Sequence, residues 1–306
     1  MISVVIPAFN EGRFLEKTLR TLTTLGDGLI DEIIVVNNGS TDNTLSICAL
    51  FPAVQVISLV EPVSIAAARN IGVFHSAGNC LVFVDADITI TTSWTKSLKS
   101  FYDNFDLNKE IVTGCKVSVS GEPSWIERYW FKNLKVKNNS YINSGNLICS
   151  RPLFLSVNGF SEFLKTGEDV DFCDRLRRAG AKIVSDPGFL VFHEGYPKTI
   201  RDFFLRERWH GIGDFYSLEK FFRSKVAVLS VVMVIGIVLA VFFMLLEQYK
   251  VALIILIIVA FMNTASLLNR VALKSIGGFL ITFSLSMLYF FARFSSLFSK
   301  RFKRVR

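Results

Sequence analysis

The sequence has few cysteines, and none of their spacings suits a structural metal site. Its five cysteines are odd in number, contain no CxxC pair and are scattered between Cys48 and Cys173. This pattern argues against a disulfide framework and a zinc site, and it favours buried, inert thiols. The basic leader of a cleavable secretory signal is also missing, because Met1–Pro7 runs directly into a predicted strand. We therefore expect the N-terminal part of the chain to remain in the cytoplasm.

Charge is absent from long stretches of the C-terminal part. Residues 226–246 and 251–268 contain no charged side chain, and each run approaches the 20 or so apolar residues that a helix needs to cross hydrocarbon. Only Glu247–Lys250 separates them, so they predict a helical hairpin in a membrane. A third segment, 276–298, is diluted by serine and threonine and is interrupted by Arg293.

The distribution of basic residues predicts the orientation of these segments. Residues 220–225 hold two lysines and an arginine before the first segment, and Arg270 and Lys274 follow the second. Because positive charge marks cytoplasmic flanks, both flanks should be cytoplasmic. The basic tail, 300–306, also favours the cytoplasm, which three full spans would not allow. Either the third segment lies in or re-enters the interface, or the tail lies outside; we expect a multi-pass protein of the cytoplasmic membrane.

The overall composition excludes an ordinary soluble domain. The chain has 306 residues, of which 51% are hydrophobic and 29 are phenylalanine, and its mean hydropathy is +0.43. Its net charge of +8 lies largely beside the membrane segments, which favours a membrane surface and phosphate groups over nucleic acid as partners. We divide the chain into residues 1–225 and a membrane region, 226–306.

Residues 1–225 alternate short apolar runs with helical patterns. This alternation predicts βαβ units, a parallel sheet and therefore an α/β domain. The predicted strands are 3–8, 32–36, 54–58 and 81–84, with helices from about Asn10 and over 64–76. Several loops should then meet at the carboxyl ends of the strands, where ligands of open α/β sheets bind.

Two carboxylates follow the last of these strands. Asp85 and Asp87 come directly after the apolar run 81–84, at the edge where a divalent cation could bind carboxylates and substrate phosphates. A DxD triplet alone is a weak signal, because it occurs by chance in surface loops. Its significance depends on the neighbouring motifs.

Five motifs in one order resemble the family 2 glycosyltransferases, and the resemblance covers about residues 1–215. They are Val5–Glu11, Val35–Asp42, Ala67–Gly72, Val84–Asp87 and Thr166–Asp169. The resemblance implies a GT-A fold, which is Rossmann-like with a mainly parallel sheet. It also implies a nucleotide-sugar half over 1–90, an acceptor half over 91–225, and Mg²⁺ or Mn²⁺ as cofactor.

The resemblance implies donor contacts at the ends of the first two strands. In the family the first turn contacts the base and ribose; here it contains Pro7, Phe9, Asn10 and Glu11. Asn10 could instead, or in addition, cap the next helix.

Asn37 and Asn38 stand where the family usually has at least one aspartate. An amide oxygen still accepts a hydrogen bond from a pyrimidine ring but brings no charge, and a plain glycine turn is the alternative.

The family's acidic motif maps onto Asp85 and Asp87. In the family the last aspartate binds the metal and the first contacts the ribose or sugar. Arg69 would lie against the nucleotide and this motif, or it could form a structural ion pair with Asp85 or Asp87. His193 resembles a histidine that binds the metal or the diphosphate in related enzymes, and a buried core histidine is the alternative.

The resemblance makes Asp169, with Glu168 beside it, the catalytic carboxylate pair. A carboxylate there can take the proton of an acceptor hydroxyl during a single displacement that inverts the anomeric configuration. The loop Asn143–Asn146 resembles the family's acceptor loop.

Arg206 and Arg208 resemble part of a QxxRW element of processive members, but Leu205 replaces its glutamine. That replacement argues against processive synthesis. The two arginines could serve diphosphate or lipid phosphate, or simply belong to a basic helix that approaches a membrane.

Together these features predict an inverting, metal-dependent glycosyltransferase of polysaccharide or glycolipid synthesis. Its expected partners are a nucleoside diphosphate sugar, with a UDP-sugar favoured, a lipid-linked or glycan acceptor, and the membrane. One alternative is an enzyme that glycosylates polyprenyl phosphate itself, and another is a non-catalytic binding or scaffold protein of the same fold.

Overall fold

The computed structural model describes residues 1–106, 110–115, 117–119, 121, 123–135, 141–272 and 275–299. The chain forms two compact units. The α/β unit comprises Met1–Gly121 and Val136–Tyr196, and the helical unit comprises Glu122–Lys135 and Pro197–Arg306. The helical unit thus includes two segments of the predicted acceptor half together with the hydrophobic helices. The functional division at residues 90 and 225 stays a prediction.

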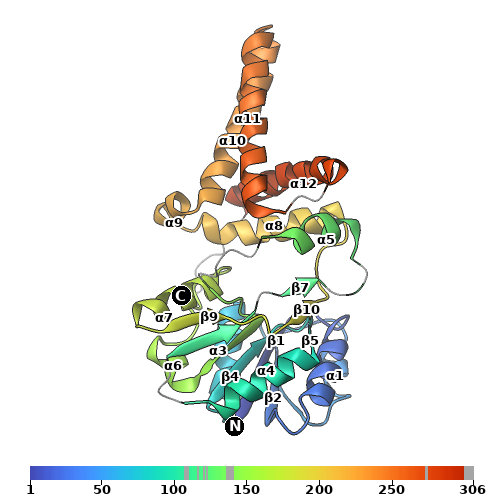
Figure 1. Cartoon of the computed structure of the whole chain (residues 1–306), viewed down its shortest axis with the longest axis vertical. Helices are drawn as coiled ribbons and strands as arrows, with labels where there is room; N and C mark the ends of the chain where they lie inside the picture. The colour runs from blue at the N-terminus through green and yellow to red at the C-terminus, as the bar shows by residue number, and fades with distance from the viewer. Residues whose placement is uncertain are drawn as a thin grey trace. The chain divides into compact units, whose positions relative to one another are not determined.

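A mainly parallel sheet forms the centre of the α/β unit, as predicted (Figure 1). Its strand order is β3-β2-β1-β4-β8-β6-β9, and only β8 runs antiparallel to its neighbours. A second, small sheet has the order β5-β10-β7. The strands are β1 (Ile2–Ala8), β2 (Glu32–Asn37), β3 (Val54–Ser58), β4 (Cys80–Val84), β5 (Ile88–Ile90), β6 (Ile111–Gly114), β7 (Ser118–Val119), β8 (Asn146–Ser150), β9 (Lys182–Ser185) and β10 (Val191–His193).

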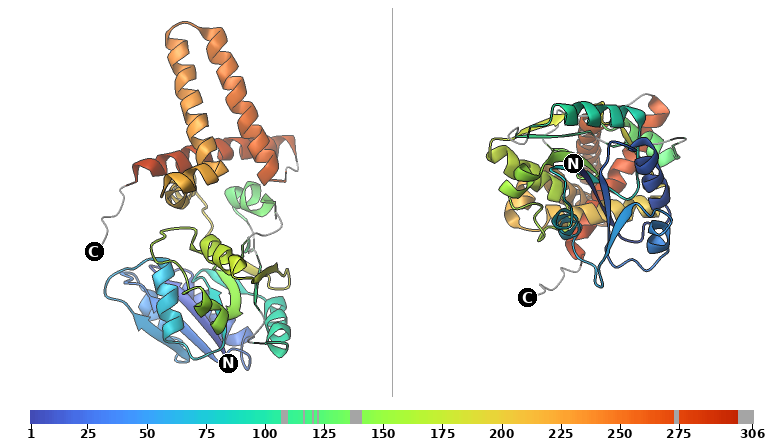
Figure 2. Two further views of the ribbon diagram at one scale, coloured as in Figure 1. Left: turned by 90° about the vertical axis from the view of Figure 1, so that its left-hand side faces the viewer. Right: turned by 90° about the horizontal axis from the view of Figure 1, so that it is seen from below.

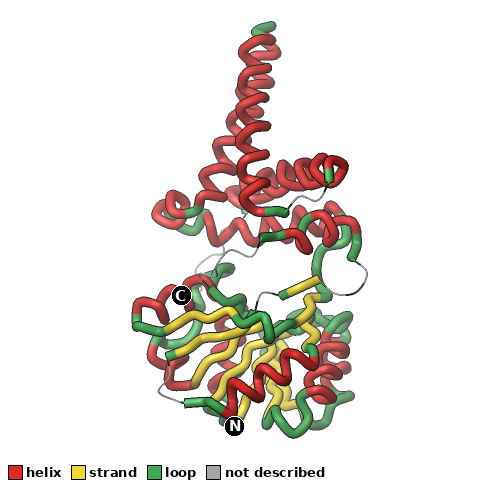
Figure 3. The backbone as a smooth tube through the Cα atoms, in the orientation of Figure 1, coloured by secondary structure: helices red, strands yellow, loops and turns green. Residues whose placement is uncertain are grey.

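Helices accompany the strands of this unit (Figure 3). They are α1 (Leu15–Leu25), α2 (Thr44–Cys48), α3 (Ile65–Phe74), α4 (Thr92–Asp103), α6 (Arg151–Ser156) and α7 (Glu168–Arg178). The prediction that the first helix starts near Asn10 is wrong by several residues. Asn10 has a positive φ of 56°, which a right-handed helix excludes, and Phe14 occupies the N-cap of α1.

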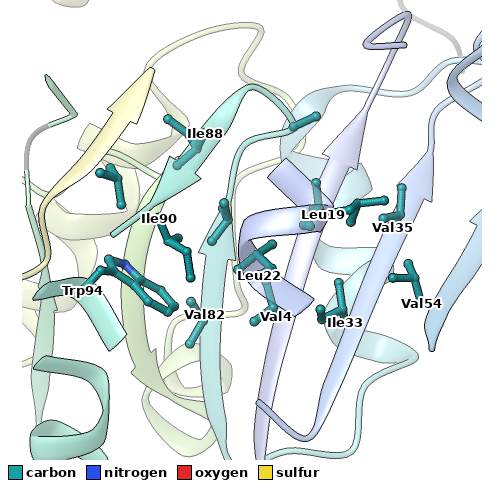
Figure 4. Packing of buried hydrophobic residues seen from close by; sticks show 14 of the residues in the cluster. Val4, Leu19, Leu22, Ile33, Val35, Val54, Val82, Ile88, Ile90 and Trp94 are labelled. Atoms are coloured by element: carbon teal, nitrogen blue, oxygen red, sulfur yellow. The ribbon is translucent and has the colours of Figure 1, made fainter. Parts of the chain in front are cut away.

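Side chains alternate across the sheet and bury both of its faces. Val4 and Ile6 of β1 belong to one hydrophobic cluster. Figure 4 shows Val4 in this cluster with Leu19 of α1 and Trp94 of α4. Val5 points to the other face and joins a second cluster, which includes residues of α3, α6 and α7. Because a strand places successive side chains on opposite faces, this pattern fixes the register of β1 and thereby the position of its carboxyl end.

The helical unit contains the predicted hairpin. It is formed by α10 (Lys225–Leu245) and α11 (Tyr249–Arg270), which run side by side (Figures 1 and 2). The other elements are α5 (Trp125–Tyr129), η1 (Phe131–Asn133), α8 (Ile200–Asp214), α9 (Leu218–Arg223), α12 (Ile276–Ser295) and η2 (Ser296–Phe298). Among the described residues, three helical stretches are long and apolar enough to cross a membrane: Lys225–Leu245, Tyr249–Arg270 and Ile276–Phe298. The basic tail, 300–306, lies outside the described residues.

Candidate active site

A buried arginine joins two carboxylates at the end of β4. Arg69, on α3, is only 1% exposed. Its Nη2 donates to Asp85 Oδ1 at 2.6 Å, and its Nη1 donates to Glu168 Oε1 at 2.8 Å. The ion pair with Asp85 is one of the alternatives left open by the sequence, whereas Glu168 was not foreseen as a partner. Since a buried charge is stable only when it is paired, this contact holds β4 and α7 together.

Asp169 follows Glu168 in the first turn of α7 and is also buried. Its Oδ1 accepts a hydrogen bond from its neighbour Val170 N at 2.8 Å, and its Oδ2 accepts one from Asn143 Nδ2 at 3.4 Å. Burial, and secondarily the charge of Glu168, raises the pKa of Asp169 to about 7. The carboxyl group can therefore exchange a proton near neutral pH.

Asp87 and His193 lie together beside the small sheet. His193, at the end of β10, pairs with Ile88 of β5, and its Nε2 lies 3.2 Å from Asp87 Oδ2. Gly195 leaves room for this carboxylate, because a Cβ atom at that position would collide with Asp87 Oδ2.

The oxygen and nitrogen donors of Asp87 and His193 fit Mg²⁺ or Mn²⁺, provided that a substrate supplies further oxygen ligands. Within the described residues, no cluster of three or more protein ligands stands ready for a metal. A cation bound here would therefore depend on the phosphates of the donor.

Asn10 ties the turn after β1 to the turn after β2. Its Oδ1 accepts hydrogen bonds from the backbone N–H groups of Thr41 at 2.8 Å and Asp42 at 3.3 Å. Its alternative role as a cap of α1 is wrong, because the helix begins further along the chain.

The two asparagines after β2 differ in what their side chains do. Asn38 Nδ2 donates to Val63 O at 3.0 Å, and Asn38 Oδ1 accepts from Val63 N at 2.8 Å. Both polar groups of Asn38 thus hold the segment before α3. Asn37 Oδ1 accepts from Ser40 N at 3.3 Å across the Gly39 turn.

Pro7, Phe9 and Glu11 complete the edge at the end of β1. Pro7 belongs to β1 and is in register with Val36, while Phe9 is 48% exposed. Burial, followed by the charges of Asp85 and Asp42, raises the pKa of Glu11 to about 7. An exposed aromatic ring and a partly buried acid therefore flank the same turn.

Arg206 and Arg208 belong to the helical unit and contact other residues of that unit. Arg206 Nη1 lies 2.6 Å from Glu207 Oε1, and its guanidinium covers the ring of Phe131 at 4.9 Å. Arg208 Nε donates to Ser299 Oγ at 3.2 Å. Their roles as phosphate ligands stay predictions.

Two residues of the loop that the sequence assigns to the acceptor also shape the carboxylate cluster, a contact that the sequence did not predict. Ser144 Oγ donates to Glu168 Oε1 at 3.1 Å, and a Cβ atom at Gly145 would collide with Asp85 Oδ2. Both belong to the loop Asn143–Asn146. Its resemblance to an acceptor loop was the feature of the sequence that could have indicated their position near the active site.

Comparisons with known proteins agree on one family of enzymes. The family described as "Glycosyl transferase family 2" matches residues 3–160. A "Pre-mycofactocin glycosyltransferase" of Mycobacterium tuberculosis is 28% identical over 224 residues, covering 69% of this chain and 46% of the relative. "Glycosyltransferase AglE" of Haloferax volcanii is 26% identical over 207 residues, covering 64% of this chain and 67% of the relative. The chain therefore spans about half the length of the first of these relatives.

The fold also resembles a solved structure. The "Mannosyltransferase PcManGT from Pyrobaculum calidifontis in complex with GDP-Man and Mn2+" superimposes with a TM-score of 0.60 at 16% identity. The match covers 98% of this chain and 88% of that protein. It confirms the GT-A-like fold of the chain.

Proposed function

The chain belongs to glycosyl transferase family 2 and is a glycosyltransferase, and we propose that it moves a sugar, with inversion, from a nucleoside diphosphate donor to a membrane-associated acceptor. The observation that carries this proposal is the environment of Asp169. Membership in the family, with relatives that are named glycosyltransferases, displaces the scaffold alternative considered for the sequence.

Asp169 is our candidate general base, and Glu168 supports it. A base works best when its pKa lies near the operating pH, and the pKa of Asp169 is raised to about 7. The acceptor hydroxyl gives its proton to Asp169 as its oxygen attacks the anomeric carbon. The bond to the diphosphate breaks on the opposite face of the sugar, so the configuration inverts.

Arg69 is a positioning residue in this proposal. It forms ion pairs with both Asp85 and Glu168, whereas Asp169 has no such ion pair among the described residues and keeps a raised pKa. Asp85 is then oriented toward the ribose or sugar of the donor.

Asp87 and His193 would hold a divalent cation together with oxygens of the donor diphosphate. The cation supplies positive charge that stabilises the leaving diphosphate. The donor set and the 3.2 Å separation of the two side chains support this assignment, and Mn²⁺ is present in the similar mannosyltransferase.

We assign the nucleoside to the turns after β1 and β2. Phe9 offers an exposed ring for a base. The Asn37 amide contacts Ser40 N and Ser58 Oγ, and the Asn38 amide contacts Val63, so both asparagines shape the turn that would receive the nucleoside. Pro7, Asn10 and Glu11 shape the same edge. A UDP-sugar is the donor we favour.

The acceptor we propose is a lipid-linked or glycan hydroxyl at the cytoplasmic face of a membrane. The three apolar helices support attachment to the bilayer. The alternative acceptor, polyprenyl phosphate, is already a nucleophile and would need no base, so the raised pKa of Asp169 favours a hydroxyl.

A thermal-shift screen of the detergent-solubilised chain tests the donor and the metal. UDP-, GDP-, dTDP- and CMP-sugars are each added with and without Mn²⁺, because a bound ligand raises the melting temperature. We expect a metal-dependent shift with a UDP-sugar that is lost in Asp87→Ala. The control variant Asp103→Ala, which removes an exposed partner of Lys99, should retain it. A shift that persists in Asp87→Ala would overturn the metal assignment, and no shift with any donor would contradict the proposed donor site.

A further inference from the structure

The third apolar helix, α12, differs from the two helices of the hairpin. An 18-residue stretch within Ile276–Phe298 has a mean hydropathy of 1.5, compared with 3.1 and 2.6 for stretches of the same length in α10 and α11. Residues buried within the protein recur along it, among them Thr282, Ser286 and Ser296. One face of α12 is therefore buried against the rest of the protein.

That face rests on the polar elements of the helical unit. Arg293 donates to Asp214 Oδ2 and Glu207 Oε2, both at 3.0 Å, and both acceptors belong to α8. Near the other end, Thr282 Oγ1 donates to Tyr129 O of α5 at 3.4 Å. The contacts thus follow most of the length of α12.

The helix α8 cannot enter hydrocarbon. Ionisable side chains inside a bilayer are costly, and α8 contains seven of them: Arg201, Asp202, Arg206, Glu207, Arg208, His210 and Asp214. A transmembrane α12 would either pull these groups into lipid or break the ion pairs of Arg293. Both outcomes are unfavourable, because removing one partner leaves a buried charge uncompensated.

The position of α12 relative to the hairpin also argues against a third transmembrane span. It lies crosswise at the end of the hairpin where α11 finishes, in both Figure 1 and Figure 2. Asn263, late in α11, donates to Phe283 O at 3.2 Å and accepts from Ser286 Oγ at 2.7 Å. The side of α12 turned away from Arg293 carries exposed apolar side chains: Leu280 is 63% exposed and Phe291 is 52% exposed. The Phe291 ring also lies 6.1 Å from the ring of Phe204 of α8, so it stands at the edge of the protein contact.

We propose that α12 lies in the plane of the membrane–water interface, with Leu280 and Phe291 toward lipid and Arg293 toward α8, so that the chain crosses the bilayer only twice. An amphipathic helix in this position buries its apolar face at the boundary of the acyl chains. Two crossings return the basic tail, 300–306, to the side that holds residues 1–224, where it can meet anionic head groups. The predicted conflict between the tail and a third span then disappears.

Depth measurements test this orientation. Nitroxide labels are placed at Leu280→Cys and Phe291→Cys of the full chain, reconstituted in phosphatidylethanolamine and phosphatidylglycerol vesicles, and their immersion is measured by power-saturation EPR. The matched control pair, Ile257→Cys and Leu268→Cys, has the same separation along α11, and all four positions are exposed. The unsubstituted chain gives the labelling background, since four of its five native cysteines are buried.

Eleven residues of helix span about 16 Å along the axis. The α11 pair should differ in depth by nearly this amount, whereas the α12 pair should show equal, shallow immersion. If the α12 labels differed in depth as much as the α11 labels, the proposal would be overturned.

A second readout uses a membrane-impermeant maleimide on sealed vesicles. We expect Leu50→Cys and Val305→Cys to react from one side and Gln248→Cys, in the hairpin turn, from the other. Reaction of Val305→Cys from the side of Gln248→Cys would establish a third crossing instead.

Discussion

Asp169 is the residue on which the proposed chemistry depends, and its pKa gives that chemistry a pH dependence. The pKa is raised to about 7, first by burial and then by Glu168. Because the ionised form is the base, kcat/KM should rise with pH and level off above about 7. The pKa of Glu11 is also about 7, so the profile is measured in Glu11→Gln as well. Loss of the pH dependence in that variant would assign it to Glu11 rather than Asp169.

The same raised pKa makes a prediction about stability. In the range between its ordinary value of 3.8 and about 7, the folded state binds more protons at Asp169 than the unfolded state does. The contribution of Asp169 to stability is therefore present at low pH and is lost as the pH rises through about 7. Asp169→Asn should melt at a higher temperature than the parent at pH 8, and this gain should shrink by pH 4. An equal shift at both pH values would contradict the assignment.

Arg69 should matter more for folding than any exposed arginine. Arg69→Met leaves Asp85 and Glu168 without their buried partner, and breaking such a pair costs about 3–5 kcal/mol. The measurement is denaturant unfolding followed by tryptophan fluorescence. Arg20→Met, which removes an exposed pair with Glu16, is the control and should change stability little. Similar stability of the two variants would show that the buried pairing is not strongly stabilising.

The sequence predicted which residues belong to the candidate site, but it did not predict all of the hydrogen bonds and ion pairs that they form. Asp85, Asp87, Glu168 and Asp169 stand in short motifs and could be located by pattern. The bond between Arg69 and Glu168 joins residues 99 positions apart, so no local pattern reports it. Engagement of the Asn38 amide by Val63 is equally invisible, because it depends on the path of a loop.

At the scale of elements, hydrophobic periodicity predicted the strands well and the boundaries less well. The parallel order of the first strands follows from alternating apolar runs. The antiparallel insertion of β8 between β4 and β6 could not be predicted, because strand direction depends on the chain's return path. The predicted start of α1 was too early, because the spacing of apolar residues does not indicate the positive φ of Asn10.

The turn after β10 makes a testable contribution through Gly195. A methyl group there would collide with the Asp87 carboxylate, so Gly195→Ala should weaken or abolish the metal-dependent thermal shift given by the donor. The overall fold should survive, because the disturbed group is a side chain near the surface. Gly277→Ala, where a Cβ meets nothing within 4 Å, is the control. If the metal-dependent thermal shift given by the donor were unchanged in Gly195→Ala, Asp87 would not be a metal ligand.

At the scale of the whole molecule, the two hydrophobic runs predicted the hairpin because length and absence of charge decide that question. The compact units of the fold bring two segments of the predicted acceptor half, one ending at Lys135 and one beginning at Pro197, together with the apolar helices through tertiary contacts. Composition alone does not register such contacts.

The apolar helices also predict where the enzyme finds its acceptor. With the full chain in vesicles, sugar transfer to a lipid-linked acceptor in the same bilayer should exceed transfer to its water-soluble head-group analogue, because attachment raises the local concentration. Transfer rates are compared at equal bulk acceptor concentration using radiolabelled donor. Equal rates would indicate that the membrane has no part in acceptor delivery.

The central claim is tested most directly by sugar transfer in Asp169→Asn. Transfer from the donor identified by thermal shift to a membrane lipid extract is measured for the parent, for Asp169→Asn and for Asp171→Asn, whose aspartate pairs with Arg175 on the same helix. We expect Asp169→Asn to lose about 100-fold or more of the rate while it retains its donor-induced thermal shift, and Asp171→Asn to remain near the parent. Parent-like transfer by Asp169→Asn would contradict the account, and would identify an acceptor that attacks without a base.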